Sequence, residues 1–537
     1  MGLEELQREG ETLVASAGPY QFTRSRKDAG WGVAFGLAYA AVVVAGIYGY
    51  VNRNPDFALI NQDYLSDPEN CPLHGGRRLR EAGQGDLPAF DAGEFMSQAA
   101  GWLGAGVALS LLLGAAFLRL FQHLPETMTR ATVLIQVAAP LAVGAGMLGS
   151  GQGRASLLPL GLAALSGLAF YLWRAEIGLA SRLLGVSAHG LAANPHLITT
   201  SVLLGVASLA AATPLAAALV LSFMNGDVVP NPGRDLAAAG GACLDEAGDP
   251  VLCCAWGVDP WVKPAAALGA LAMLWTLLLA NQVRVYVISG TVAQWYFAPP
   301  GALHVTRGTT RRALGHAFGP SFGSLALSSL VLTITEALRN SAERNAQENQ
   351  DVLSWVMSCI AQCLAGIVEY LTKFATVFMA ITGDAFFAAG RRVTDLLARN
   401  LLDAFASTIW FTPMVIQLAA FSMAVGWGFA SGGVYYLAHR GAAAGVEASP
   451  GLNAAVLGGM VGLASLFLLN FLGGVLLAVL DAAFVCWALD RDAQSVSHPE
   501  IAQAFDAVPR KGAVVEQPGG GLAYGGLAHE APAQQRV

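Results

Sequence analysis

The segment FGPSFGSLALSSLVLTITEALR (Phe318–Arg339) follows GTVAQWYFAPP (Gly290–Pro300) and a short connection that contains three arginines. The segment carries no charge from Phe318 to Thr335, and a basic connection before an uncharged run is typical of a membrane helix entered from the cytosol. Small residues at its start permit close helix packing, and Pro320 leaves backbone groups that a neighbour must satisfy. Transporters often place a site at such a broken helix.

The whole chain repeats this apolar pattern. Of its 537 residues, 55% are hydrophobic and only 12% are charged, about half the charged share of an average soluble protein. Because about 20 apolar residues cross a bilayer, we predict an all-α polytopic membrane protein with about ten transmembrane helices. The expected spans are Trp31–Val51, Ser97–Leu118, Ala131–Gly149, Ala155–Trp173, Thr199–Met224, Pro264–Val285, Phe318–Leu338, Val368–Phe387, Ala406–Ala430 and Leu452–Leu489.

The charges between the spans give the expected orientation. With the N-terminus inside, 19 of the 30 lysines and arginines fall on segments assigned to the cytosolic side. We therefore expect a cytosolic N-terminal segment at residues 1–30, a transmembrane domain at 31–489 and a cytosolic, largely disordered tail at 490–537. External loops are expected near 52–96 and 225–261, and residues 174–196 are expected to contain an interfacial helix.

Three motifs in the C-terminal half resemble those of the choline transporter-like family of the solute-carrier type. They are GTVAQWYF followed by an FGSL helix, FATVFMAITGDAFFAAGRRVTDLLARN at Phe374–Asn400, and DAAFVCWALDRD at Asp481–Asp492. The sequence departs from the family pattern in having Gly319-Pro320 before FGSL, Thr372 before the second motif and Arg391 after ITGDAFF. These departures leave the predicted fold standing and leave the substrate open.

The resemblance implies a transporter for choline or a related organic cation, working by facilitated or proton-coupled alternating access. It implies a multi-pass protein of the plasma membrane, with an organelle membrane as the other possibility. The expected partners are the small cation and the lipid bilayer. The alternatives are a membrane scaffold or lipid-organising protein with the same fold, or a transporter of another substrate.

Aromatic and acidic side chains in the spans are the candidate substrate contacts, because a quaternary ammonium binds aromatic faces and nearby carboxylates. The candidates are Trp295, Tyr296, Phe322, Phe378 and Asp481. Ordinary interface or packing roles explain the same aromatic residues equally simply. Asp481 is the most informative, since an acidic residue inside an apolar span is a functional hypothesis by default. The alternative is that the long overhang of Leu452–Leu489 places Asp481 in the cytosol. Phe322 is expected to face a cation beside carbonyls that Pro320 frees.

Cysteines cluster in the loop at 225–261. Cys243, Cys253 and Cys254 would face an oxidising compartment, and we predict a disulfide between Cys243 and either Cys253 or Cys254. No histidine lies near this cluster, so we predict no metal site there. The sequence also shows no hydrolase, phosphate-binding or zinc-protease motif and no basic cluster, so we predict no enzyme, no cofactor and no nucleic-acid partner.

Overall fold

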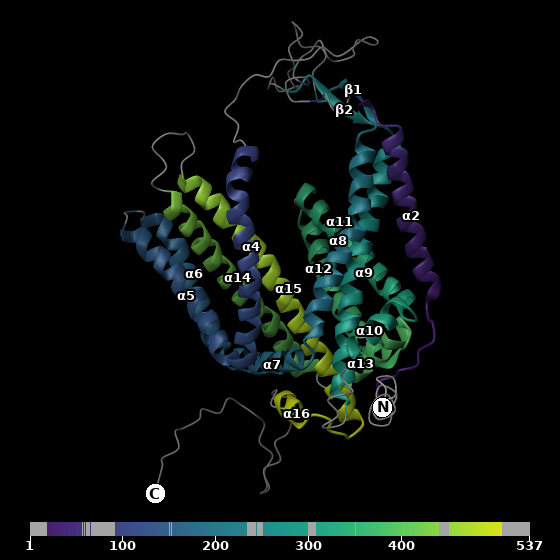
Figure 1. Cartoon of the computed structure of the whole chain (residues 1–537), viewed down its shortest axis with the longest axis vertical. Helices are drawn as coiled ribbons and strands as arrows, with labels where there is room; N and C mark the ends of the chain where they lie inside the picture. Colours follow the sequence, from purple (N-terminus) through teal and green to yellow (C-terminus); the bar gives the residue numbers. More distant parts are fainter. Residues whose placement is uncertain are drawn as a thin grey trace.

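A computed structural model shows an all-α membrane protein (Figure 1). The structure describes residues 19–55, 57, 60, 65, 92–149, 151, 153–233, 243, 251–298, 308–349, 351–400, 402–439 and 450–506. Within these residues ten helices are long and apolar enough to cross a membrane, which confirms the predicted fold class. They are α2 (Ala29–Val51), α4 (Ala92–His123), α5 (Pro125–Gly149), α6 (Gly153–Leu172), α8 (His196–Phe223), α9 (Val262–Tyr296), α11 (Phe322–Asn349), α12 (Val352–Thr382), α14 (Leu402–His439) and α15 (Pro450–Asp492).

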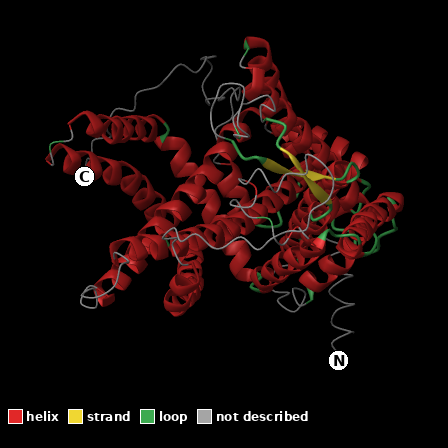
Figure 2. Cartoon of the chain, turned by 90° about the horizontal axis from the view of Figure 1, so that it is seen from above, coloured by secondary structure: helices red, strands yellow, loops and turns green. Residues whose placement is uncertain are grey.

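The long helices form two groups. Figure 1 shows α4, α5, α6, α14 and α15 on one side, and α2, α8, α9, α11 and α12 on the other. The long helix α15 contacts α14 and α4 in its own group and α9 and α12 in the other. Viewed from above, helices make up nearly all of the described chain (Figure 2). Helix α15 therefore joins the two halves of the molecule.

Short elements mark the two ends of the bundle. Helices α7 (Arg174–Ala193), α10 (Thr309–Phe318), α13 (Phe386–Asn400) and α16 (Pro499–Asp506) lie at one end, which we call the short-helix end. Strands β1 (Gly226–Pro230) and β2 (Cys254–Val258) pair antiparallel at the other, the sheet end. Helix α7 covers the region where an interfacial helix is expected, and its Leu183, Leu184 and Leu191 are buried. The predicted regions 1–18, most of 52–96 and 507–537 lie outside the described residues.

A disulfide closes the connection between the two strands. Cys243 is bonded to Cys253, with 5.1 Å between their Cα atoms, which confirms the predicted pairing. Cys254 is also disulfide-bonded. The region predicted as an external loop thus contains a small antiparallel sheet, with a disulfide in the connection between its strands.

We expect Cys243→Ser to lower the free energy of unfolding by roughly 2–3 kcal/mol, because the bond closes a loop of about ten residues. Thermal unfolding of the detergent-purified protein measures the effect. Cys363→Ser is the matched control, since Cys363 is free and exposed. Equal melting temperatures for the two variants would show that the disulfide adds no stability.

The predicted boundaries around the eighth span need correction. Helix α12 begins at Val352 and the spanning segment runs over Leu353–Thr382, not Val368–Phe387. It ends at Gly383, whose φ of +71° places it in the left-handed region and whose N–H donates to the Met379 carbonyl at 2.9 Å. The amphipathic segment before residue 368 thus belongs to the span, and the residues after Asp384 form the separate helix α13.

Candidate functional site

A buried ion pair joins α12 to α15. The Nζ atom of Lys373 lies 2.5 Å from Oδ2 of Asp481. Asp481 is only 6% exposed, whereas the Lys373 side chain is 36% exposed. Asp481 lies 11 residues before the end of α15, which places it about 16 Å inside that helix at 1.5 Å per residue. Charged side chains within a long apolar helix are costly to bury, so a pair there marks a candidate functional site.

Three aromatic residues lie close to this pair along α12 and α15. The rings of Tyr370 and Phe374, one on each side of Lys373 in the sequence, have centroids 4.8 Å apart. Phe374 in turn meets Phe484 of α15 edge to face at 6.2 Å. Phe374 and Phe484 are fully buried, and Phe484 follows Asp481 by one helical turn. A carboxylate beside several aromatic rings is a chemically suitable environment for an organic cation.

Polar contacts from α9 reach the same three-helix junction. The Thr376 hydroxyl of α12 donates to Oε1 of Gln282 at 2.6 Å, and both residues are buried. The Arg284 guanidinium lies 4.9 Å from the centre of the Phe471 ring on α15 and donates to Oδ1 of Asn281 at 2.7 Å. A hydrogen bond therefore joins α9 to α12, and a cation–π contact joins α9 to α15.

Of the predicted site residues, Asp481 lies in this junction and Phe378 lies one turn beyond Phe374 on α12. Phe378 is buried, and its carbonyl accepts a hydrogen bond from the Thr382 hydroxyl at 3.0 Å. The structure thus brings Phe378 to the same helix as Tyr370 and Phe374, on the side toward the short-helix end. A substrate contact by Phe378 stays a prediction.

Trp295 and Tyr296 lie elsewhere, as the last two residues of α9 at the short-helix end. Trp295 stacks on His498 with centroids 4.9 Å apart, and Tyr296 is fully buried against Phe297. Tyr296 borders a cavity of about 330 Å³. The cavity is also lined by Trp487, Asp490, Arg491, Gln494, Ser495, Val496, Ala502 and Asp506. Tyr296 thus borders a cavity at the end of α9 and α15, and a substrate contact by Trp295 or Tyr296 stays a prediction.

Phe322 begins α11 on the side that faces α2. Its ring centroid lies 6.3 Å from that of Phe35 and 6.4 Å from that of Phe318. In a regular helix Pro320 would leave the His316 carbonyl of the preceding turn without its usual donor. That carbonyl is not free for a cation, because it accepts a hydrogen bond from the Ser321 N–H at 3.0 Å. A substrate contact by Phe322 stays a prediction.

The spacing of charges in the sequence predicts two ion pairs, Glu336 with Arg339 and Asp384 with Arg391. Glu336 pairs with Arg339 at 2.6 Å, as its spacing suggests. Asp384 pairs with Arg392 at 2.8 Å rather than with Arg391, because the chain turns at Gly383 before α13 begins. Sequence reasoning missed Lys373 and Tyr370. A single lysine within an apolar span was the available signal.

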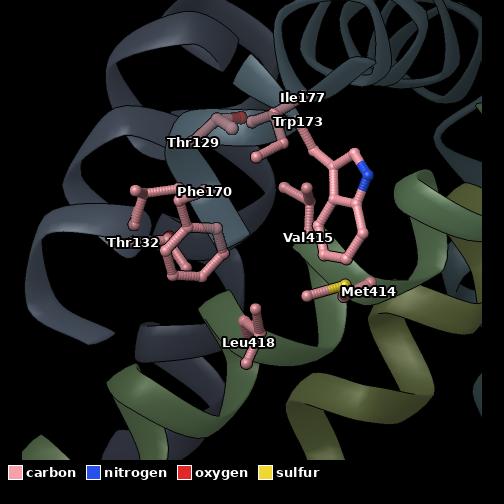
Figure 3. Close-up of a pocket in the computed structure, with 9 residues that line it drawn as sticks. Thr129, Thr132, Phe170, Trp173, Ile177, Met414, Val415 and Leu418 are labelled. Carbon is pink, nitrogen blue, oxygen red and sulfur yellow. The ribbon is translucent and has the colours of Figure 1, made fainter. Parts of the chain in front are cut away.

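An apolar pocket lies between α5, α6, α7 and α14 (Figure 3). Thr129 and Thr132 lie on one side of it, and Met414 and Leu418 on the other. Its volume is only about 10 Å³, close to the minimum for one water molecule. This pocket is a packing defect too small for an organic cation.

Ten apolar spans and a charged, aromatic junction buried among them are typical of a multi-pass membrane transporter. The family model for plasma-membrane choline transporters matches residues 157–492, which is 336 of the 537 residues. The chain belongs to this family, and the resemblance seen in the C-terminal half is confirmed. A search of curated proteins finds no match. The matched region runs from α6 to the end of α15 and includes the Lys373–Asp481 junction.

Proposed function

We propose that this protein carries choline or a related organic cation across the plasma membrane, and that Asp481, Tyr370, Phe374 and Phe484 form its binding site. The Lys373–Asp481 pair carries this proposal, since it places a carboxylate among aromatic rings inside the membrane. Choline has no N–H to donate, so aromatic faces and a carboxylate are the groups that recognise it.

Lys373 acts as an internal substitute for the substrate. Its ammonium neutralises Asp481 while the site is empty, and the substrate cation takes its place on binding. Lys373 can leave because its side chain is long and one-third exposed, whereas Asp481 is held in the interior. Exchange of one cation for the other changes the contact between α12 and α15, which is the movement that alternating access requires.

The same exchange distinguishes two transport modes. If Lys373 moves toward water and keeps its proton, transport of the substrate is facilitated and moves no proton. If Lys373 releases its proton when the substrate binds, transport is coupled to proton exchange. Arginine cannot give up its proton in a protein. Lys373→Arg therefore retains facilitated transport and abolishes proton-coupled exchange.

We place the short-helix end in the cytosol. The basic residues before α2 lie at this end, as the positive-inside rule requires. The disulfide between Cys243 and Cys253 lies at the sheet end, where an extracellular position supplies the oxidising conditions. The cavity beside Tyr296 would then open toward the cytosol.

Uptake of labelled choline into proteoliposomes tests the proposal. We expect Asp481→Asn to reduce uptake at low substrate concentration at least tenfold, the factor that about 1.4 kcal/mol of lost cation attraction supplies. Glu369→Gln is the control, because Glu369 is an exposed carboxylate on the same helix as Lys373.

Two outcomes contradict the proposal in different ways. Absence of organic-cation uptake by the intact protein would favour the scaffold alternative. Normal uptake and affinity in Asp481→Asn would move the binding site away from this junction.

A further inference from the structure

The segment before α2 crosses the short-helix end of the bundle. We call residues Tyr20–Asp28 the strap. Its Gln21 N–H donates to the Ile381 carbonyl near the end of α12 at 3.1 Å, and its Lys27 N–H donates to the Pro320 carbonyl before α11 at 3.3 Å. Backbone bonds thus attach the strap to the end of α12 and to the turn that precedes α11.

Arg24 holds the centre of the strap. Its guanidinium donates to the carbonyls of Met379 at 3.2 Å and Ala380 at 2.7 Å, and to the hydroxyl of Tyr286 on α9. Carbonyls in the last turn of a helix lack partners within it and carry its negative dipole end, so they favour a cation. The Tyr286 hydroxyl also bonds the Ser321 hydroxyl at 2.7 Å. One side chain therefore connects α12, α9 and the start of α11.

Asp28 makes the complementary contacts. Its Oδ2 atom accepts from the Ser324 hydroxyl in the first turn of α11 at 2.6 Å and from the Phe386 N–H at the start of α13 at 3.2 Å. The beginnings of helices favour an anion. A Cβ atom on Gly323 would lie 2.2 Å from the Asp28 carbonyl oxygen, so glycine is required for this approach. The strap thus places the Arg24 cation at the C-terminal end of α12 and the Asp28 anion at the N-terminal ends of α11 and α13.

The side chains beneath the strap are compatible with its positive charge. Burial, followed by the nearby charges of Arg24 and Arg312, lowers the pKa of His316 to about 4. His316 is therefore neutral near pH 7 and does not repel Arg24. Arg312 lies over the ring of Phe22, 5.1 Å from its centre, which adds a further contact with the strap.

We propose that the strap is a latch that keeps the short-helix end closed, and that Arg24 must leave the end of α12 before α12 can move relative to α9 and α11. Lys373 lies on the same helix, six residues before Met379, or about 9 Å away along its axis. Displacement of Lys373 and release of Arg24 would therefore act on one rigid element. The role of the latch in transport rests on the proposed function, whereas the closure itself does not.

Accessibility of a cysteine beneath the strap tests the closure without any substrate. Ser321→Cys would be introduced together with Cys359→Ser and Cys363→Ser, and its modification by a membrane-impermeant maleimide followed at the short-helix side. Ser321 is buried beneath Tyr286. We expect Arg24→Gln to speed this modification at least tenfold. Arg26→Gln, the same change at an exposed position of the strap, should leave the rate unchanged.

Native Cys486 is the internal control for folding, because it is fully buried in α15. Faster modification at position 321 with Cys486 still protected is a local release and supports the latch. An unchanged rate at position 321, or an equal increase at Cys486, would overturn it. Mass spectrometry of the labelled peptides separates the two sites.

A disulfide that fixes the strap to α11 tests the role of the latch in transport. Asp28→Cys combined with Ser324→Cys places two thiols where the native side chains are hydrogen-bonded. Oxidation should stop choline uptake, and a reductant should restore it, while the parent protein under the same treatments gives the baseline. Full uptake with the cross-link formed would show that the strap need not open. Failure of choline transport in the parent would contradict the proposed function and leave the accessibility result to decide the latch.

Discussion

Lys373→Ala is expected to lower the free energy of unfolding by about 3–5 kcal/mol, the typical cost of leaving one member of a buried ion pair without its partner. Asp481 is the residue left behind, because its side chain is enclosed within the junction of α12 and α15. The expected loss is much larger than that from an exposed pair, which is usually worth less than about 1 kcal/mol.

The double variant Lys373→Met with Asp481→Leu separates stability from function. Removal of both charges removes the cost of burying them, so we expect a free energy of unfolding close to that of the parent protein. Cation uptake should nevertheless be lost, because the carboxylate is absent. Thermal unfolding in detergent and uptake into proteoliposomes provide the two measurements.

Arg130→Ala is the control for the loss of one cation, since Arg130 pairs with Glu126 on an exposed surface. A melting temperature for Lys373→Ala equal to that of this control would show that the buried pair does not stabilise the fold. Normal uptake in the double variant would assign the pair a structural role only.

Hydropathy predicted the membrane architecture well, because a span is a local property of about 20 consecutive residues. It failed where helices continue beyond the membrane. Helix α11 extends through polar residues to Asn349 and is paired with α12, so the connection between them is much shorter than expected. Pairing of two helices over this length cannot be read from the polarity of either one.

The candidate site was only partly predictable for a related reason. Asp481 stands out in the sequence as a charge within an apolar run, but its partner Lys373 lies on a different helix more than 100 residues earlier. In the sequence, Arg24 is only one of several basic residues before the first span, where it supports the predicted orientation. Its actual contacts with Met379 and Tyr286 arise from tertiary packing, which a charge count does not contain.

Gly458→Leu is expected to lower the free energy of unfolding by on the order of 3 kcal/mol or more, which is the upper end of the usual penalty for overpacking. Helices α14 and α15 cross where two pairs of glycines, each four residues apart, bring their backbones together. A Cβ atom on Gly458 would lie 2.7 Å from the Gly428 carbonyl oxygen and 3.2 Å from the Cα atom of Gly432. Backbone atoms cannot move aside as a flexible side chain can, so the helices must separate.

Gly459→Leu is the matched control, because nothing lies within 4 Å of a Cβ atom at that position. Both changes replace a glycine in the same helix and gain the same helix propensity, up to about 1 kcal/mol. Only Gly458→Leu opposes the close packing of small residues that holds membrane helices together. Size-exclusion profiles and melting temperatures of the two variants should therefore diverge. Identical behaviour would mean that α15 is held in place by its contacts with α4, α9 and α12 rather than by this crossing.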